Sequence, residues 1–144
     1  MVVRAIPEGY HSVTPYLIGP DVAGLVAFFT AAFGATETER VADRDGTVRH
    51  AEVRIGDSRV MMGEPSGDYA PMPVMLQLYV EDVDAVYARA MGAGATSIEE
   101  PADQFYGDRR GGVRDPNGNQ WWIATRKEDL SHEEIVRRAA AATR

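Results

Sequence analysis

One pattern occurs twice in the sequence, about 60 residues apart, and this internal repeat limits the possible fold more than any other feature. In each copy an Asp-Val pair begins a run with a helical apolar stripe, and Gly-Ala-Thr ends it. Aspartate is favoured at the N-cap of a helix, and glycine is favoured just beyond its last residue. A period of this length is typical of a duplicated half-domain rather than a solenoid. The two copies begin at Asp21 and Asp82, end at Gly34 and Gly94, and predict helices over residues 23–33 and 84–93.

Strand-like runs, rich in apolar and β-branched residues, flank both predicted helices. Each helix follows one such run and precedes three more. This order predicts an α+β fold built from two tandem βαβββ modules. The runs of the first half cover residues 13–18, 36–42, 48–55 and 58–62, and those of the second half cover residues 74–80, 96–101, 106–114 and 120–125.

The segments outside the modules carry loop and helix signals. Residues 64–73 hold three prolines and a glycine, which indicates a linker. Ser131-His132-Glu133-Glu134 is a capping box, and it predicts a C-terminal helix that packs as an appendage because its apolar face is thin. We expect one domain over residues 8–128, with modules at about 10–64 and 73–126, followed by a helical segment over residues 129–144.

A hairpin is predicted near the end of the second module. Asp115-Pro116-Asn117-Gly118 has the composition of a tight turn, because proline fixes φ and Asn-Gly tolerates positive φ. β-branched and aromatic residues flank this turn on both sides, as they do in strands. Two consecutive tryptophans, Trp121 and Trp122, follow it, and strand alternation puts them on opposite faces of the sheet.

The charge balance argues against several classes of partner. The chain has 22 acidic and 15 basic residues, and a surface with a net charge of −7 repels nucleic acids and anionic membranes. No apolar run approaches the roughly 20 residues that span a bilayer. Cysteine is absent, so the sequence offers no disulfide, no thiol nucleophile and no thiolate metal ligand. This usage fits a reducing compartment, and we expect a cytoplasmic protein.

Three features together resemble a known superfamily. They are the paired βαβββ pattern, the opening Pro15-Tyr16-Leu17-Ile18 with Asp21 and Phe28-Phe29, and Tyr106-Gly107-Asp108-Arg109 with the hairpin from Asp115 to Trp121. Over about residues 11–126 the chain resembles the vicinal oxygen chelate superfamily, which holds glyoxalase I, extradiol dioxygenases, fosfomycin resistance enzymes and bleomycin-binding proteins. The hairpin signature is most similar to the PhnB-like branch. The resemblance implies a mixed sheet in each module, curled into a cup, with two cups enclosing a pocket.

The resemblance also implies where a metal ion would bind. In the metalloenzymes, the first and last strands of each module supply His, Glu or Gln ligands, which leave open positions for two substrate oxygens. None of the matching positions holds such a side chain, and thioethers suit soft ions only. We therefore expect no metal ion, no other cofactor and no catalytic residue. The positions are Val13 or Thr14, then Val60, Met61 or Met62 depending on register, then Met75 and Trp122.

Histidines elsewhere give weaker candidates. His11 lies just before the first-strand position, where we expect an ordinary strand-end histidine. His50 and Glu52 share one strand face, which suits either a metal or acid–base pair or the solvent face of a hairpin, and we prefer the solvent face. His132 lies in the capping box, away from other candidate groups. Without a cysteine or a serine elbow, nucleophilic catalysis has no candidate residue.

Strand alternation predicts the side chains that line the pocket. They present thioether, indole, phenol and amide groups, which suit an apolar or aromatic ligand with few polar anchors. The alternative is that the same side chains fill the cup as a packed core. Trp121, on the opposite face, is expected to pack under a helix. The predicted ligand-binding residues are Thr14, Met62, Met75, Gln77, Tyr79, Tyr106 and Trp122.

These expectations favour one function and leave two alternatives. We expect a metal-free protein that binds a small apolar or aromatic metabolite or drug, as in sequestration or antibiotic resistance. One alternative is a metal-dependent lyase, isomerase or dioxygenase of the same superfamily whose ligands lie elsewhere in the chain. The other is a dimeric scaffold without a ligand. The resemblance also implies a homodimer, while the sequence does not identify the ligand.

Overall fold

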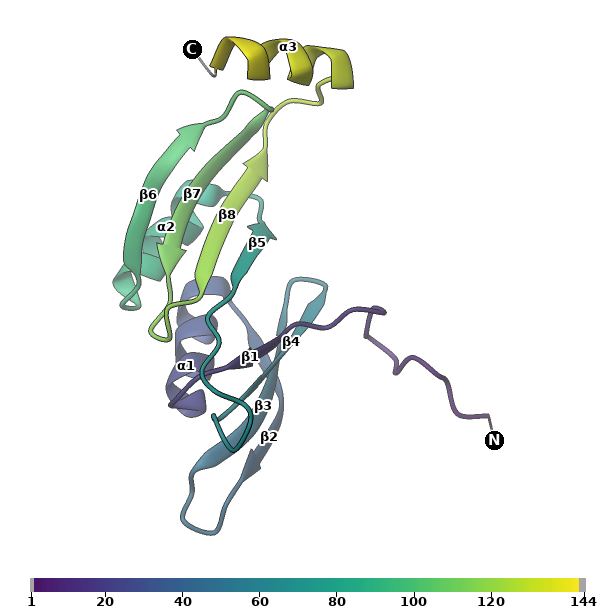
Figure 1. The fold of residues 1–144 in the computed structure, drawn as a ribbon, viewed down its shortest axis with the longest axis vertical. Coiled ribbons are helices and arrows are strands. Elements are labelled where there is room, and N and C mark those ends of the chain that lie inside the picture. Colours follow the sequence, from purple (N-terminus) through teal and green to yellow (C-terminus); the bar gives the residue numbers. More distant parts are fainter. Residues whose placement is uncertain (1, 143–144) are drawn as a thin grey trace.

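The computed structural model describes residues 2–142 as two four-stranded sheets and three helices (Figure 1). The predicted α+β fold of two tandem βαβββ modules is confirmed. The first module contains β1 (Tyr16–Ile18), α1 (Val22–Phe33), β2 (Thr36–Ala42), β3 (Val48–Ile55) and β4 (Ser58–Gly63). The second contains β5 (Met75–Tyr79), α2 (Val83–Gly92), β6 (Thr96–Asp103), β7 (Asp108–Arg114) and β8 (Gln120–Arg126), and α3 (His132–Ala142) follows.

The two sheets share one topology. Their strand orders are β1-β4-β3-β2 and β5-β8-β7-β6, and in each the first strand runs parallel to the last while the other neighbours are antiparallel. Figure 1 shows the sheets end to end along the long axis, with α1 and α2 side by side and α3 beyond the second sheet. Each sheet packs one face on a helix. We call the opposite face of each sheet its open face.

Both repeat helices begin as the sequence predicts. The Asp21 carboxylate accepts a hydrogen bond from the Gly24 amide at 3.1 Å, and the Asp82 carboxylate accepts one from the Ala85 amide at 3.2 Å. Each aspartate thereby satisfies an amide of the first turn that has no partner inside the helix. Gly34 ends α1 with a φ of 65°, a left-handed conformation that favours glycine.

Several strand ends differ from the prediction by one to three residues, and β1 and β6 are examples. The sequence predicts a first strand from residue 13, but β1 begins at Tyr16. Pro15, just before it, has no amide hydrogen to donate to the sheet, although its carbonyl accepts a bond from the Met61 amide at 2.9 Å. In the second module, β6 continues through Pro101, which an edge strand tolerates.

Trp121 joins the two modules. It is 3% exposed, and its ring lies 5.2 Å from that of Phe29 and 4.9 Å from that of Phe33, measured between centroids. Both phenylalanines belong to α1, so the indole of the second module packs under the helix of the first. The expectation that Trp121 packs under a helix is confirmed. The hydrophobic core is therefore continuous from one module to the other.

The predicted turn between β7 and β8 is fixed by one buried carboxylate. Asp115 accepts hydrogen bonds from the backbone amides of Asn117 and Asn119, at 2.9 and 3.0 Å, and from the side-chain amide of Asn119 at 2.9 Å. Its Oδ2 also accepts the indole N–H of Trp121 at 2.9 Å. Gly118 has a φ of 83°, as this turn requires. The same carboxylate therefore holds the turn and the tryptophan that joins the modules.

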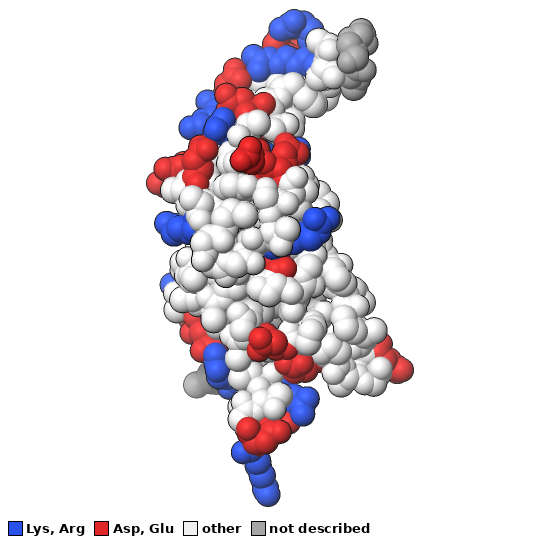
Figure 2. Space-filling model, turned by 90° about the vertical axis from the view of Figure 1, so that its left-hand side faces the viewer, with Lys and Arg blue, Asp and Glu red and all other residues white. Residues whose placement is uncertain are grey.

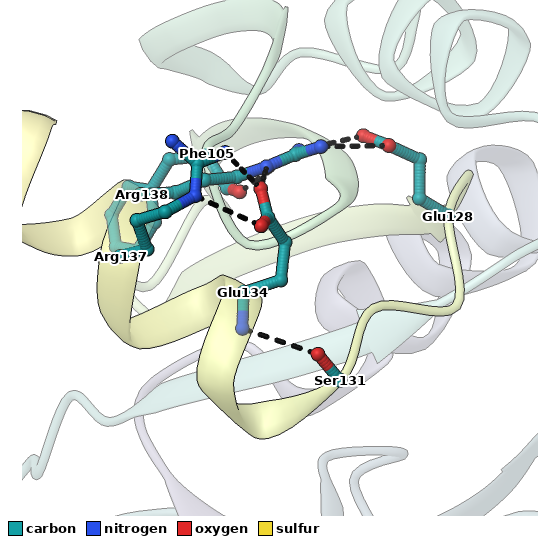
Figure 3. Close-up of polar contacts among 6 residues, drawn as sticks. All are labelled: Phe105, Glu128, Ser131, Glu134, Arg137 and Arg138. Carbon is teal, nitrogen blue, oxygen red and sulfur yellow. Dashed lines mark hydrogen bonds and ion pairs between the residues drawn. The ribbon is translucent and has the colours of Figure 1, made fainter.

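The predicted C-terminal helix is present as α3, which is attached by the Arg138–Glu128 ion pair and by a hydrogen bond from Arg138 to the Phe105 carbonyl rather than by a core. The Ser131 hydroxyl accepts the Glu134 amide at 3.2 Å, as the capping box predicts. Figure 3 shows Arg138 between Glu128 and Glu134, bonded to both carboxylates. No residue of His132–Ala142 is buried, in agreement with an appendage. Residues 143 and 144 of the expected helical segment lie outside the described residues.

Charged side chains of both signs are mixed over the surface. The face in Figure 2 has acidic and basic groups close together toward both ends and a broad zone with few charged groups between them. A nucleic-acid-binding surface needs a continuous basic stretch instead, and this face shows none. Within residues 2–142, every helix is too short or too polar to cross a membrane.

Candidate functional site

The open face of the second sheet presents apolar and aromatic side chains to solvent. Met75 and Tyr79 of β5 are 66% and 59% exposed, whereas the other side of this sheet packs against α2. Gln77 lies between them and is the register partner of Trp122 on the neighbouring β8. Side chains of paired residues share a face, so these four residues form one surface. Exposed thioether and aromatic groups in contiguous positions are typical of a binding surface.

Trp122 is held flat against the sheet by its neighbours. Gly112 on β7 is its register partner, and a Cβ at that position would lie 2.7 Å from the indole. The absence of a side chain therefore allows the ring to approach the backbone. The Arg110 guanidinium lies over the ring, 4.5 Å from its centroid, and Gln120 accepts the indole N–H at 3.2 Å. Neighbours on β7 and β8 therefore hold the indole in place.

A cavity of about 470 Å³ lies at the far end of this open face, next to α3. Its lining consists of Tyr79, Tyr106, Asp108, Arg126, Glu128, Leu130 and Ile135. The Tyr79 hydroxyl donates to Asp108 Oδ2 at 2.7 Å, and this bond raises the pKa of Tyr79. Burial raises the pKa of Tyr106. Because both pKa values are raised, the phenols of Tyr79 and Tyr106 are neutral at physiological pH. We call this hollow the Asp108 cavity.

The open face of the first sheet is more polar. Glu52 is only 2% exposed and accepts hydrogen bonds from the hydroxyls of Tyr10 and Thr38, the latter at 2.7 Å. Arg59 pairs with it at 3.1 Å. Burial by itself raises the pKa of Glu52, but the Thr38 and Tyr10 hydrogen bonds and the Arg59 charge outweigh it and hold that pKa below its usual value. The expectation that Glu52 lies on a solvent face is wrong, because the segment before β1 covers it.

His50 lies beside Tyr16 on the same open face. The Tyr16 hydroxyl and His50 Nδ1 are 3.1 Å apart, and the two rings have centroids 5.7 Å apart. A cavity of about 570 Å³, lined by Tyr16, Arg49, Glu64 and Tyr69, adjoins this pair and the linker. His50 therefore belongs to a polar and aromatic surface. It does not form a pair with Glu52, because the partner of His50 is Tyr16, whereas those of Glu52 are Tyr10, Thr38 and Arg59.

The predicted ligand-binding residues lie in three places. Met75, Gln77, Tyr79 and Trp122 lie together on the second open face, and Tyr106 joins Tyr79 in the Asp108 cavity. Thr14 lies in the segment before β1, where it lines a cavity of about 250 Å³ together with Gln77.

Met62 is the exception, and its expected place in the ligand site is wrong. It is fully buried in the core of the first module, on the helix side of β4. Its neighbour Met61 points to the open face and is the register partner of Tyr16. Successive side chains of a strand point to opposite faces, so an error of one residue in register exchanges core for pocket.

The side chains at the four metal-ligand positions do not fit a divalent ion. With the register of β4 fixed, these positions are Val13 or Thr14, then Met61, Met75 and Trp122. An alkyl or hydroxyl group, two thioethers and an indole supply neither the imidazole nor the carboxylate oxygens that Fe, Mn, Ni or Zn prefer. Across residues 2–142, moreover, no three His, Asp or Glu side chains are close enough to hold a metal ion together.

Sequence reasoning missed Asp108 and Arg110 as members of the site. Both lie on β7 with Gly112, at alternating positions, and therefore face the same side as Trp122. The alternation was available from the sequence once Trp122 was placed. Their charges, however, suggested solvent exposure, whereas Asp108 is 5% exposed.

Comparison with protein families and with known sequences gives consistent matches. Residues 9–123 match the family described as "Glyoxalase/Bleomycin resistance protein/Dioxygenase superfamily". An uncharacterised protein of Mycobacterium bovis is 34% identical over 135 residues, covering 86% of this chain and 89% of that protein. An uncharacterised protein of Mycobacterium tuberculosis is also 34% identical over 135 residues, covering 86% of this chain and 79% of that protein.

Solved structures have the same fold. TioX from Micromonospora sp. ML1 is similar with a TM-score of 0.72 and 25% identity, covering 81% of this chain and 98% of TioX. A glyoxalase-related enzyme from Fulvimarina pelagi has a TM-score of 0.67 and 18% identity, covering 80% of this chain and 87% of that enzyme. At such identities the second likeness concerns the fold alone.

Proposed function

This chain belongs to the glyoxalase/bleomycin resistance protein/dioxygenase superfamily, and from that premise we propose that it binds a small apolar or aromatic molecule without a metal ion. The observation that supports this most is the second open face, where thioether and aromatic side chains stand at the positions of the metalloenzyme ligands. Such groups bind carbon surfaces through contact area rather than through coordination. Sequestration of a metabolite or drug, as in antibiotic resistance, is the role we propose.

The proposal also concerns assignment within the superfamily and location in the cell. We assign the chain to the PhnB-like branch, on the residues Tyr106 to Arg109 and Asp115 to Trp121. We propose a single domain over residues 8–128, followed by the helical segment. A cytoplasmic location agrees with the lack of cysteine in the sequence.

We expect a homodimer in solution. In a single chain, exposed residues such as Met75 and Tyr79 lie uncovered on the open face of the second sheet. Pairing of two copies would close a pocket between facing sheets, because a single cup leaves its ligand open to water. Sedimentation equilibrium at micromolar concentration should give the mass of two chains. A mass near the 15.7 kDa of one chain would contradict this arrangement.

The proposed function is tested by direct binding to protein stripped of metal. We expect chelator-treated protein to bind the neutral probe naphthalenemethanol saturably in equilibrium dialysis, with the same affinity after Ni²⁺, Zn²⁺, Mn²⁺ or Fe²⁺ is added. Elemental analysis of untreated protein should find less than a stoichiometric amount of these metals.

Two other outcomes would each overturn the proposal. About one tightly bound ion per chain, or binding that requires the added metal, would favour a metal-dependent lyase, isomerase or dioxygenase. No saturable binding of the neutral probe under any of these conditions would favour a scaffold without a ligand.

A further inference from the structure

Asp108 is a buried carboxylate for which the described chain provides no ion-pair partner. It is 5% exposed, and within residues 2–142 its side chain has one hydrogen-bond partner, the Tyr79 hydroxyl at 2.7 Å. Transfer of a charge from water to a protein interior is costly unless a group of opposite sign compensates it. No basic side chain among residues 2–142 pairs with Asp108, so a positively charged ligand could take that place.

The neighbouring arginines are already bound to other carboxylates. Arg126 lies directly across from Asp108 in the β7–β8 pairing and also lines the cavity, but its guanidinium is paired with Asp129. Arg110, two residues further along the same face, lies over Trp122 and pairs with Glu99. Arg109 points to the other side of the sheet. The ion pairs of these arginines are Arg126–Asp129, Arg110–Glu99, Arg109–Asp84 and Arg109–Asp103.

The surroundings of Asp108 suit an organic cation better than a metal ion. The carboxylate lies in a cavity of about 470 Å³ together with two phenol rings, those of Tyr79 and Tyr106. Aromatic faces attract ammonium groups, whereas a hard metal ion needs several oxygen ligands. Leu130 and Ile135 offer apolar contact. Two charged side chains that also line the cavity have ion-pair partners outside it, Arg126 with Asp129 and Glu128 with Arg138. The site thus combines the Asp108 carboxylate, two aromatic rings and a hydrocarbon wall.

We propose that the Asp108 cavity binds the ammonium group of an organic cation, whose carbon body packs against Tyr79, Tyr106 and the apolar side chains of the α3 segment. This assignment names the charge of the ligand and rests on the proposed function. The ammonium hydrogens donate to the carboxylate oxygen that Tyr79 does not occupy. The net charge of −7 favours the approach of cations over anions.

The test compares three naphthyl probes whose polar groups are positively charged, neutral and negatively charged. Equilibrium dialysis is carried out on the full chain with naphthylmethylammonium, naphthalenemethanol and naphthoate. We expect the cation to bind about tenfold more tightly than the alcohol, which is the size expected for one charge-assisted hydrogen bond, and naphthoate to bind most weakly. Equal affinity of cation and alcohol overturns the inference but leaves the proposed function in place. Failure of all three probes to bind overturns both.

Variants assign the preference to this carboxylate. Asp108→Asn keeps the shape and an oxygen for Tyr79, and it should remove the tenfold preference for the cation over the alcohol. Asp84→Asn is the matched control, because it removes the same charge from the other side of the sheet, where Asp84 binds Arg109. It should keep the preference.

A second variant keeps the test decisive even if Asp108→Asn does not fold. Ile135 lies on α3, of which no residue is buried, so Ile135→Lys adds an ammonium group to the cavity without disturbing a core. It should abolish the preference for the cation. A preference that persists in both Asp108→Asn and Ile135→Lys would show that another part of the molecule attracts the cation, and the inference would be wrong.

Discussion

Replacement of Trp121 by alanine is expected to lower the free energy of unfolding by about 3–5 kcal/mol, the range for large aromatic side chains in protein cores. The indole is 3% exposed and lies against Phe29 and Phe33 of the other module. Its loss leaves a cavity at the junction and removes a donor from Asp115. Urea denaturation at fixed protein concentration measures the effect, because the proposed pairing of chains would make the midpoint depend on concentration.

Trp121→Phe is the matched control for this experiment. It keeps an aromatic ring against Phe29 and Phe33 but removes the hydrogen bond to Asp115, so about 1–2 kcal/mol should be lost. If the unfolding free energy falls less steeply with urea concentration in Trp121→Ala than in the wild type, the modules no longer unfold together. A loss below about 1 kcal/mol for Trp121→Ala would contradict the role of this residue as the junction.

Replacement of the next residue, Trp122, by alanine is expected to affect binding instead. Its indole lies on the second open face, between Gly112 and Arg110, and is only partly buried. Truncation of an aromatic residue at a binding hot spot costs roughly 2 kcal/mol or more, which corresponds to about a 30-fold loss of affinity. Naphthalenemethanol binding in equilibrium dialysis measures this loss. The free energy of unfolding should change by less than about 1 kcal/mol.

The opposite result for Trp122→Ala would identify a packed core. A loss of about 3–5 kcal/mol in stability, with no binding of naphthalenemethanol to the wild type, would mean that the cup is filled by its own side chains. Trp121→Phe serves as the control in this case too, since it should bind the probe as the wild type does. The two consecutive tryptophans thus separate stability from binding within one strand.

The fold could be predicted from the sequence because the features that specify it, helix caps and a turn, are formed by residues close together in the chain. The repeated Asp-Val and Gly-Ala-Thr segments carry the caps of α1 and α2, and each cap involves residues close in sequence. The Asp115 turn is equally local, since all partners of its carboxylate lie within six residues. Period-two alternation then placed Met75, Gln77 and Tyr79 on one face.

The remaining features depend on contacts between distant residues. Tyr10 covers Glu52 from 42 positions away, so alternation along β3 alone predicted a solvent face for a carboxylate that is buried. The register of β4 against β1 decides whether Met61 or Met62 faces the open side of the sheet. It depends on how the two parallel strands pair and cannot be read from either strand alone. The docking of Trp121 on a helix of the other module likewise depends on how the halves pack.

The junction at Trp121 has a consequence for the entropy of binding. Trp121 and Trp122 are linked by one peptide bond, and the first is fixed by two phenylalanines and a carboxylate. The backbone that carries the second is therefore immobile before a ligand arrives, and Gly112 and Arg110 restrict its ring. Ordering a rotamer-rich side chain at an interface costs about 0.5–1.5 kcal/mol. Trp122 is already ordered in the folded chain, so binding does not add this cost. The wall of the site is thus preorganised.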